Sequence, residues 1–464
     1  MPSLPRLAGY TAALSFGCLV LMGPAWVNGY PLLFPDSIIY LDDGDAVVAR
    51  LAQGAATGWP ASGRPVWYGV AIWPLYVDRT LWPVVVAQGL MVAHLAWLAW
   101  RGFGVPFRPL GLAVALAALA VASPVSWYVS HIMPDIFVGA LILAFCLLAL
   151  CRDRLRPGER AYLAVLIVAA IAFHVSHLAV AMTLWGQTAA MWAALPWWRA
   201  RIRPARLALP VVAGCCTLVV YPWLTLHDLA LAPASLPWPL ARLWADGLAQ
   251  RYLNAACPTT HYILCDYLAS VPDGSPEAFL WGDGSAVQDA DFQAVRAEAP
   301  QIVMKTLGSY PMAAARLAAW RFVHQLATIG SAAQFSDFDA AELRREQPAA
   351  SAGFVHSRQA AATAGPQRIG WLDDVWQASM AAATFAIGAL VRPLWRIGAY
   401  RLLAALLTIA TGLAANAFAT GVISGVYGRY QGRVVWLLPL WLIAAIVVWR
   451  RSRIGRCDVA GAAP

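Results

Sequence analysis

The chain has 464 residues, of which 60% are hydrophobic and 12% are charged, and its mean hydropathy is +0.60. A soluble chain would carry about twice this charged fraction, so the composition excludes a soluble globular protein and predicts an all-α, polytopic membrane protein. The net charge of +9 could indicate nucleic-acid binding in a soluble protein. Here the enrichment of arginine in loops on one side of a membrane explains it, and we expect no nucleic acid among the partners.

Apolar runs long enough to cross a bilayer, roughly 17–25 residues each, follow one another along the chain. They predict spans near 7–27, 81–100, 109–129, 134–151, 205–223, 376–395, 401–423 and 433–449. We expect 7–27 to be a retained helix rather than a cleaved signal, because only Arg6 precedes it and no small-residue cleavage site follows. The run 161–198 is too long for one helix, and the turn from His174 to His177 is expected to divide it.

This layout predicts a bundle of about ten spans with both termini on the same side. We divide the chain into an N-terminal membrane module of about seven spans (1–223), an extracytoplasmic, mostly helical segment (224–375), and a C-terminal membrane module of three spans with a tail (376–464).

Arginine sets the expected orientation. The loops at 101–108, 152–160, 199–206, 392–401 and 450–458, together with Arg6, contain 18 arginines but only three acidic residues. The other loops contain the remaining 21 of the 24 acidic residues. Because cytoplasmic loops are rich in arginine and lysine, we expect a bacterial inner-membrane protein with cytoplasmic termini and an extracytoplasmic functional face.

The extracytoplasmic face begins with a first loop, 28–80, in which the short apolar stretch 63–78 predicts an interfacial or re-entrant helix. In the long segment 224–375, helical spacing of apolar residues predicts one helix from about 300 to 328, on the membrane surface. The Ala/Gln/Ser-rich stretch 330–370 is expected to be mobile. Cys257 and Cys265 lie in a polar loop and are expected to form a disulfide in an oxidising compartment.

Acidic residues in the first loop are candidates for chemistry. Asp36 follows Pro35, where it could serve a functional site or begin a short helix as its N-cap. Asp43 and Asp45 resemble a two-carboxylate site for a hard divalent cation such as Mg²⁺ or Mn²⁺, although an acidic turn has the same pattern. No cofactor is otherwise indicated.

Three further constellations share the extracytoplasmic face. His131 and Asp135 flank the Met133-Pro134 turn, where Asp135 could bind substrate or stabilise a helix N-terminus. His174 and His177 in one turn could bind phosphate or sugar hydroxyls. Arginines before the last span oppose the orientation rule, at i and i+4 on one helix face, and suit phosphate binding or interfacial anchoring. These arginines are Arg429 and Arg433, with Arg64 as a lesser candidate.

With these residues in place, the chain resembles the GT-C superfamily of polytopic membrane glycosyltransferases, and most closely bacterial membrane proteins whose activity is not assigned. The resemblance rests on Asp36 in Pro35-Asp36-Ser37, Asp135 in Met133-Pro134-Asp135, His174 to His177, and Arg429 and Arg433. It implies a sugar donor linked to a polyprenyl phosphate and a lipid, glycan or protein acceptor, with membrane lipids around the protein. It also implies that Asp36 acts as general base, that the arginines neutralise the departing phosphate, and that Asp135 and the histidines hold hydroxyls.

Other classes remain open on the sequence. A flippase or transporter for lipid-linked glycans would show polar residues along a path through the spans, and few are visible. A membrane acyltransferase could use His131 or His177, but their expected location separates them from cytosolic acyl-CoA. A structural protein could use 224–375 as a docking surface.

Overall fold

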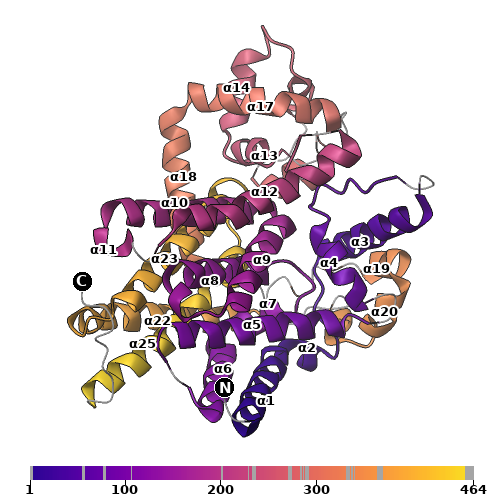
Figure 1. Cartoon of the computed structure of the whole chain (residues 1–464). Coiled ribbons are helices and arrows are strands. Elements are labelled where there is room, and N and C mark those ends of the chain that lie inside the picture. The colour runs from indigo at the N-terminus through magenta and orange to yellow at the C-terminus, as the bar shows by residue number, and fades with distance from the viewer. Residues whose placement is uncertain are drawn as a thin grey trace.

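The computed structural model describes residues 4–54, 58–76, 80–105, 107–199, 202–227, 229–231, 237–269, 274–282, 285, 287, 292–330, 335, 338, 340–362 and 369–454. Within these residues the fold is all-helical, as predicted, and the only extended pairing is one isolated bridge between Leu32 and His131. Figure 1 shows the helices gathered into a bundle, with a smaller group of helices at one end.

The expected apolar runs all form helices. In chain order they are α1 (Leu4–Leu21) with α2 (Gly23–Asn28), α5 (Trp82–Gly102), α6 (Pro109–Ala122) with α7 (Val125–Ser130), α8 (Ile136–Leu150), α9 (Pro157–Phe173), α10 (Val175–Ala194), α12 (Pro204–Leu226), α22 (Trp371–Arg396), α23 (Tyr400–Ala417) with η5 (Phe418–Val422), and α24 (Gly428–Val435) with α25 (Leu437–Arg453). In the part of the chain that the structure describes, five stretches are long and apolar enough to span a membrane, in α5, α12, α22, α23–η5 and α24–α25. The chain is therefore a helical membrane protein, while the full count of ten spans stays a prediction.

Two of the expected spans are interrupted. Helix α1 ends at Leu21, and α2 starts again one residue later with Pro24 in its first turn. Helix α6 ends before Ser123, and Pro124 separates it from α7. Proline lacks the amide hydrogen that a continuous helix needs, so it begins a new helix instead. The division of 161–198 is present as predicted, since His174 is extended between α9 and α10.

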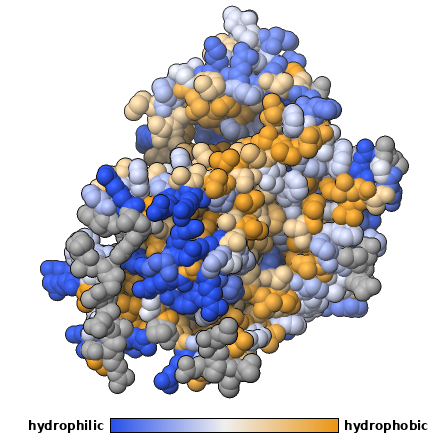
Figure 2. Space-filling model, viewed as in Figure 1, coloured by the Kyte–Doolittle hydropathy of each residue, from blue (hydrophilic) through white to orange (hydrophobic). Residues whose placement is uncertain are grey.

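The core of the bundle is α8, in which all but one of the residues Ile136–Leu150 are buried. A helix that is apolar on every side belongs at the centre of a bundle, and α8 contacts α5, α9, α10 and α23. By contrast, large apolar side chains on outer helices are exposed, among them Val121, Leu209 and Phe385. Figure 2 shows such apolar surface over much of the visible face. Lipid-facing helices of a membrane protein have this surface.

The segment after α12 has its own core. Helices α13 (Trp238–Ala245), α14 (Leu248–Ala256), η3 (Ile263–Tyr267), α15 (Pro276–Trp281) and α17 (Phe292–Ser309) enclose a separate cluster of buried apolar residues, including Trp244 and Phe279. Figure 1 shows α13, α14 and α17 at the end of the molecule beyond α10 and α12. Cys257 and Cys265 form a disulfide in this segment, with a Cα–Cα distance of 5.7 Å.

Two expectations for this segment are wrong. The single helix expected at 300–328 is two helices, α17 and α18 (Pro311–Ala327), because Pro311 starts a new helix after Tyr310. The stretch expected to be mobile instead contains three short helices that bury Leu343, Phe354 and Gln359: α19 (Ala340–Glu346), α20 (Pro348–Phe354) and α21 (Arg358–Ala362). Residues 331–334, 336, 337, 339 and 363–368 of that stretch lie outside the described part.

The first loop is also helical. Helix α3 (Pro35–Gln53) packs along α4 (Trp67–Tyr76), which occupies the stretch expected to form an interfacial helix. The two helices approach closely at glycines. A Cβ on Gly69 would lie 2.1 Å from the carbonyl oxygen of Tyr40, and one on Gly44 would lie 2.7 Å from that of Gly69. Any larger residue at either position would push α3 and α4 apart.

Candidate functional site

The two Pro-Asp segments lie side by side in the same register. The amide of Leu32 donates to Ser130 O over 2.8 Å, and the amide of Ile132 donates to Leu32 O over 3.0 Å, in a parallel bridge. The offset of 99 residues between Leu32 and His131 is the same offset that separates Asp36 from Asp135. Because of this bridge, α3 and α8 begin next to each other in space, and each helix has a carboxylate at its N-terminus.

Neither carboxylate makes a side-chain capping hydrogen bond, although Asp135 is the N-cap residue of α8 and Asp36 lies in the first turn of α3, where a negative charge favours the helix N-terminus. No side-chain capping hydrogen bond is present at the start of α3 or α8. The amide of Phe34 is instead bound by Ser37 Oγ at 2.9 Å, and that hydroxyl donates to Ile132 O at 2.9 Å. Asp36 and Asp135 thus have their carboxylates available for other partners.

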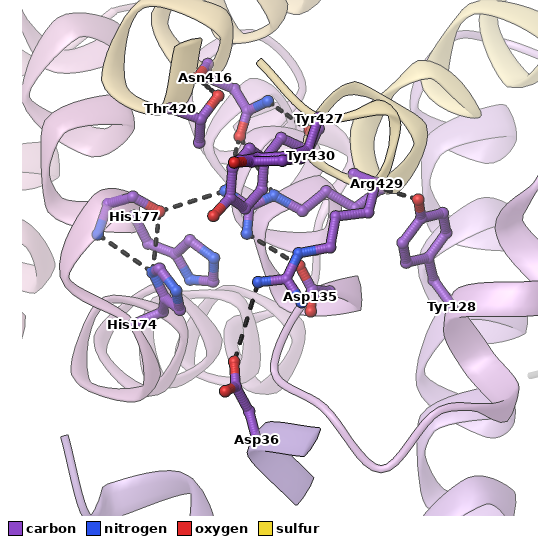
Figure 3. A network of polar contacts seen from close by, with 12 residues as sticks. Asp36, Tyr128, Asp135, His174, His177, Asn416, Thr420, Tyr427, Arg429 and Tyr430 are labelled. Carbon is purple, nitrogen blue, oxygen red and sulfur yellow. Dashed lines mark hydrogen bonds and ion pairs between the residues drawn. The ribbon is translucent and has the colours of Figure 1, made fainter. Parts of the chain in front are cut away.

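Asp36 is bound by arginines from two distant parts of the chain. Arg64 Nη2 donates to Asp36 Oδ1 at 2.6 Å, and Arg429 Nη2 lies 3.8 Å from Asp36 Oδ2 (Figure 3). The Arg429 guanidinium is centred 4.2 Å from the ring of Phe34 and 5.0 Å from that of Tyr430, which fixes its position. Its Nη1 atom is buried and has no hydrogen-bond partner among the described residues.

Arg433 is fully buried and lies at the centre of a second network. Its Nη1 donates to Asp135 Oδ1 at 2.9 Å, and its Nη2 donates to Asn416 Oδ1 at 3.0 Å and to Ser176 Oγ at 3.2 Å (Figure 3). The Arg433 side chain is 0% exposed. Burying a guanidinium is costly unless a carboxylate and further acceptors surround it, and this network supplies both. Arg433 therefore links α24 to α8, α10 and α23.

The histidine pair lies beside this network. The amide of Ser176 donates to His174 Nδ1 at 3.2 Å, so His174 caps α10. His177 Nδ1 lies 2.7 Å from Ala170 O, and its Nε2 is buried without a partner among the described residues. A histidine whose Nδ1 donates to a carbonyl presents Nε2 as an acceptor. The predicted pair thus divides into a capping residue and a histidine with one unoccupied nitrogen.

His131 is close to the site but its ring contacts the backbone. Its Nδ1 lies 2.9 Å from Trp127 O, and its own carbonyl oxygen accepts a hydrogen bond from Gln88 Nε2 at 2.8 Å. Burial lowers the pKa of His131 to about 4, so the ring is neutral near pH 7. The structure therefore gives His131 a role in holding the Ser130–Asp135 turn, and among the described residues no hydrogen bond or ion pair joins its ring to either carboxylate.

The predicted metal residues do not converge. Asp43 and Asp45 are two positions apart on α3, and such residues do not face each other on a helix. Asp43 Oδ2 accepts from Ser62 Oγ at 2.6 Å, whereas Asp45 accepts from Tyr76 Oη and Gln347 Nε2, both at 2.8 Å. Burial raises the pKa of Asp43 to about 6. In the described part of the chain no group of three or more His, Cys, Asp or Glu side chains could hold a metal ion.

The convergent residues carry more positive than negative charge. Arg64, Arg429 and Arg433 face two carboxylates, Asp36 and Asp135, and all five side chains are largely removed from solvent. The excess guanidinium charge is concentrated at Arg429, whose nearest carboxylate oxygen is beyond hydrogen-bond distance. A buried site with this imbalance favours an anionic ligand, and planar guanidinium groups suit phosphate oxygens.

Comparison with known proteins identifies no relative of the chain. The chain matches no protein-family model, no curated protein and no solved structure. The GT-C resemblance consequently stays a prediction, and function has to be argued from the site itself.

Sequence reasoning missed several members of the site. Asn416, Ser176, Tyr128 and Tyr430 contribute contacts, with Tyr128 Oη donating to Arg429 O at 2.9 Å. Asn416 could have been found as a polar residue in the apolar run 401–423, since such residues commonly mark functional sites in membrane helices. It also lies just before the π-helical turn η5, and π-turns frequently occur at functional sites.

Proposed function

We propose that the chain is a membrane glycosyltransferase that transfers a sugar from a polyprenyl-phosphate-linked donor to a lipid, glycan or protein acceptor. The observation that carries the proposal is the convergence of Asp36 with Arg64 and Arg429, from three separate segments, beside a helical membrane bundle. A carboxylate suits general-base work, and arginines suit the phosphate of a lipid-linked donor.

The proposed reaction is a direct displacement. The acceptor hydroxyl attacks the anomeric carbon, its proton moves to the carboxylate of Asp36, and the bond between the anomeric carbon and the phosphate oxygen breaks. The electron pair of that bond stays on the phosphate, where Arg429 and Arg64 neutralise the charge. Arg429 is the better placed of the two because its Nη1 lacks a partner among the described residues. Arg433, Asp135 and Asn416 hold α24 in position, and His177 Nε2 accepts from a substrate hydroxyl.

The proposed site faces the extracytoplasmic side of a bacterial inner membrane, because the arginine-rich loops lie at the opposite ends of the helices that form it. Lipid-linked sugars are available there, and a lipid surface confines donor and acceptor to two dimensions. Holding both reactants at the bilayer surface supplies part of the positioning advantage. Any requirement for Mg²⁺ or Mn²⁺ at Asp43 and Asp45 stays a separate prediction.

The test is complementation of a deletion strain, with polyprenyl-phosphate sugars measured in lipid extracts. We expect the deletion to accumulate such a lipid, and Asp36→Asn to fail to relieve it, with transfer reduced about 10²–10⁴-fold as for loss of a general base. Asp153→Asn is the matched control, because Asp153 also pairs with an arginine at 2.8 Å, Arg401, but far from the site.

Three results would contradict the proposal. Full complementation by Asp36→Asn would remove Asp36 as the base. An unchanged lipid profile in the deletion strain would remove the donor class. Accumulation confined to the inner leaflet would favour the alternative of a flippase for lipid-linked glycans.

A further inference from the structure

A group of arginines at the other end of α9 has no counterpart in the proposed reaction. Arg160 lies in the first turn of α9, and Arg203 and Arg206 lie at the start of α12. Arg152 follows the end of α8. Arg160 is 14 residues before His174, which at about 1.5 Å per residue places it roughly 21 Å along the helix from the histidine pair. This group is therefore distinct from the candidate active site.

The arginines are close enough to repel one another. Partial burial, followed by the positive charges of Arg160, Arg206 and Arg203, lowers the pKa of Arg152. Helices α9 and α12 pack along each other, and both start at this end. Their N-terminal amides add further positive potential to that of the side chains.

Acidic residues nearby do not neutralise this charge. Asp153 binds Arg401 at 2.8 Å, and Glu159 binds Arg101 through both carboxylate oxygens. No ion pair is present for Arg152, Arg160, Arg203 or Arg206 among the residues that the structure describes, and the Nε atom of Arg160 is buried without a partner there. The group is an uncompensated cationic surface.

Apolar surface begins directly beside these arginines. Leu209 and Val212, one and two turns after Arg206 on α12, are 70% and 58% exposed, and Val165 on α9 is 66% exposed. Figure 2 shows strongly hydrophilic residues gathered on one face next to apolar surface. A ligand that matches both surfaces has an anionic head and hydrocarbon chains.

We propose that Arg152, Arg160, Arg203 and Arg206 bind the phosphate headgroup of an anionic phospholipid, whose acyl chains lie along the exposed apolar faces of α9 and α12. Guanidinium groups bind phosphate oxygens in pairs, and cationic residues at a membrane surface attract anionic lipids. A free phosphate ion would gain nothing from the apolar faces, so the surface points to a lipid. This inference does not depend on the proposed glycosyltransferase activity.

The test measures lipid retained by the purified full-length protein, using native mass spectrometry in detergent with added dioleoyl phosphatidylglycerol or dioleoyl phosphatidylcholine. We expect the wild type to retain phosphatidylglycerol and to retain phosphatidylcholine at least about tenfold less. The variant R152Q/R160Q/R203Q/R206Q should retain at least about tenfold less phosphatidylglycerol than the wild type. R203Q/R206Q, which keeps half of the group, should show an intermediate loss and covers the case in which the fourfold variant misfolds.

The control variant removes the same number of exposed arginines from elsewhere, as R251Q/R316Q/R344Q/R358Q, and should bind like the wild type. Equal losses in R152Q/R160Q/R203Q/R206Q and in the control variant would overturn the proposal, because these two variants lose the same charge and the effect would then follow net charge alone. Equal retention of both lipids by the wild type would also overturn it. Displacement of phosphatidylglycerol by an equal concentration of inorganic phosphate would show that the surface takes free phosphate rather than a lipid.

Discussion

At the scale of single residues, Arg429 and Arg433 have different surroundings, although the sequence predicts phosphate binding for both. Their i, i+4 spacing predicts two guanidinium groups acting together on one phosphate. In the structure, Arg433 is fully buried and bound by Asp135, Asn416 and Ser176, whereas Arg429 extends towards Asp36. The difference arises because acceptors from α8, α10 and α23 reach only Arg433, and sequence spacing contains no information on those neighbours.

This division predicts different consequences for stability. Arg433→Gln or Asp135→Asn should each lower the free energy of unfolding by about 3–5 kcal/mol, because each leaves the other charge buried without its partner. The double variant should lose less than the sum of the two single variants. Thermal unfolding of the detergent-purified protein measures the effect.

The control for this prediction is Arg401→Gln, which breaks a partly exposed pair with Asp153, in which the arginine and aspartate side chains are 16% and 60% exposed. Exposed pairs contribute about 0–1 kcal/mol. If Arg433→Gln destabilised the protein no more than Arg401→Gln, the buried network around Arg433 would not contribute to stability.

At the scale of elements, the residues just before α24 are held by the segment 224–375. Gln325 of α18 donates from Nε2 to Tyr427 O at 2.9 Å and accepts from the Tyr427 amide at 3.0 Å. Gly330 donates to Gly428 O at 3.2 Å, and Arg242 of α13 donates to Ser424 O at 3.4 Å. These contacts are made to backbone atoms one to five residues before Arg429. They therefore fix the position of the backbone from which the Arg429 side chain extends.

We expect Gln325→Leu to impair activity because the half-buried amide of Tyr427 loses its hydrogen bond to Gln325, and Tyr427 O keeps only the bond from the Tyr430 amide. Unmade buried hydrogen bonds cost about 1–3 kcal/mol each, and Arg429 would lose its position. Activity in the complementation assay should fall more than tenfold while the protein still purifies as a folded species. Gln377→Ala is the control, since Gln377 bonds one backbone oxygen, that of Ile329.

An unchanged activity in Gln325→Leu would mean that the segment 224–375 does not position Arg429. An equal loss in Gln377→Ala would mean that the effect is general to contacts of this segment.

The boundaries of helices were predictable where the composition of the sequence changes sharply. They were not predictable where a helix forms only because it packs against the rest of the protein. The runs in α5, α8, α12, α22, α23 and α25 were found from apolar length alone, and His174 was found as the division between α9 and α10. The helices α19, α20 and α21 were missed because they are short and contain few large apolar residues. They form because Leu343, Phe354, Gln347 and Gln359 are buried against the rest of the protein, and isolated helices of that length are not stable in water.

At the scale of the whole molecule, the arginine-rich ends of the helices and the candidate active site lie at opposite ends of α9. The charge asymmetry predicts that the arginine-rich end is cytoplasmic and the active site extracytoplasmic. The disulfide between Cys257 and Cys265 is consistent with an oxidising compartment for the segment beyond α12.

Single cysteines test this orientation. In a background with Cys215, Cys216 and Cys457 changed to serine, Arg344→Cys should react with a membrane-impermeant maleimide in intact cells. Asp153→Cys should react only after the inner membrane is permeabilised. Both positions are exposed, so access to the reagent depends on the side of the membrane. The reverse pattern would invert the predicted topology and place the candidate site in the cytoplasm.

The sequence by itself determined that the chain is a helical membrane protein and which of its polar residues are unusual for their location. Composition and apolar run length suffice for this, because a bilayer imposes one length and one polarity on every span. Only the tertiary structure decided which of those residues meet. The Leu32–His131 bridge brings two Pro-Asp segments together. The packing of α24 against α8 and α23 pairs Arg433 with Asp135 and leaves Arg429 facing Asp36. These contacts join residues from 99 to nearly 400 positions apart, and local sequence patterns do not encode such separations.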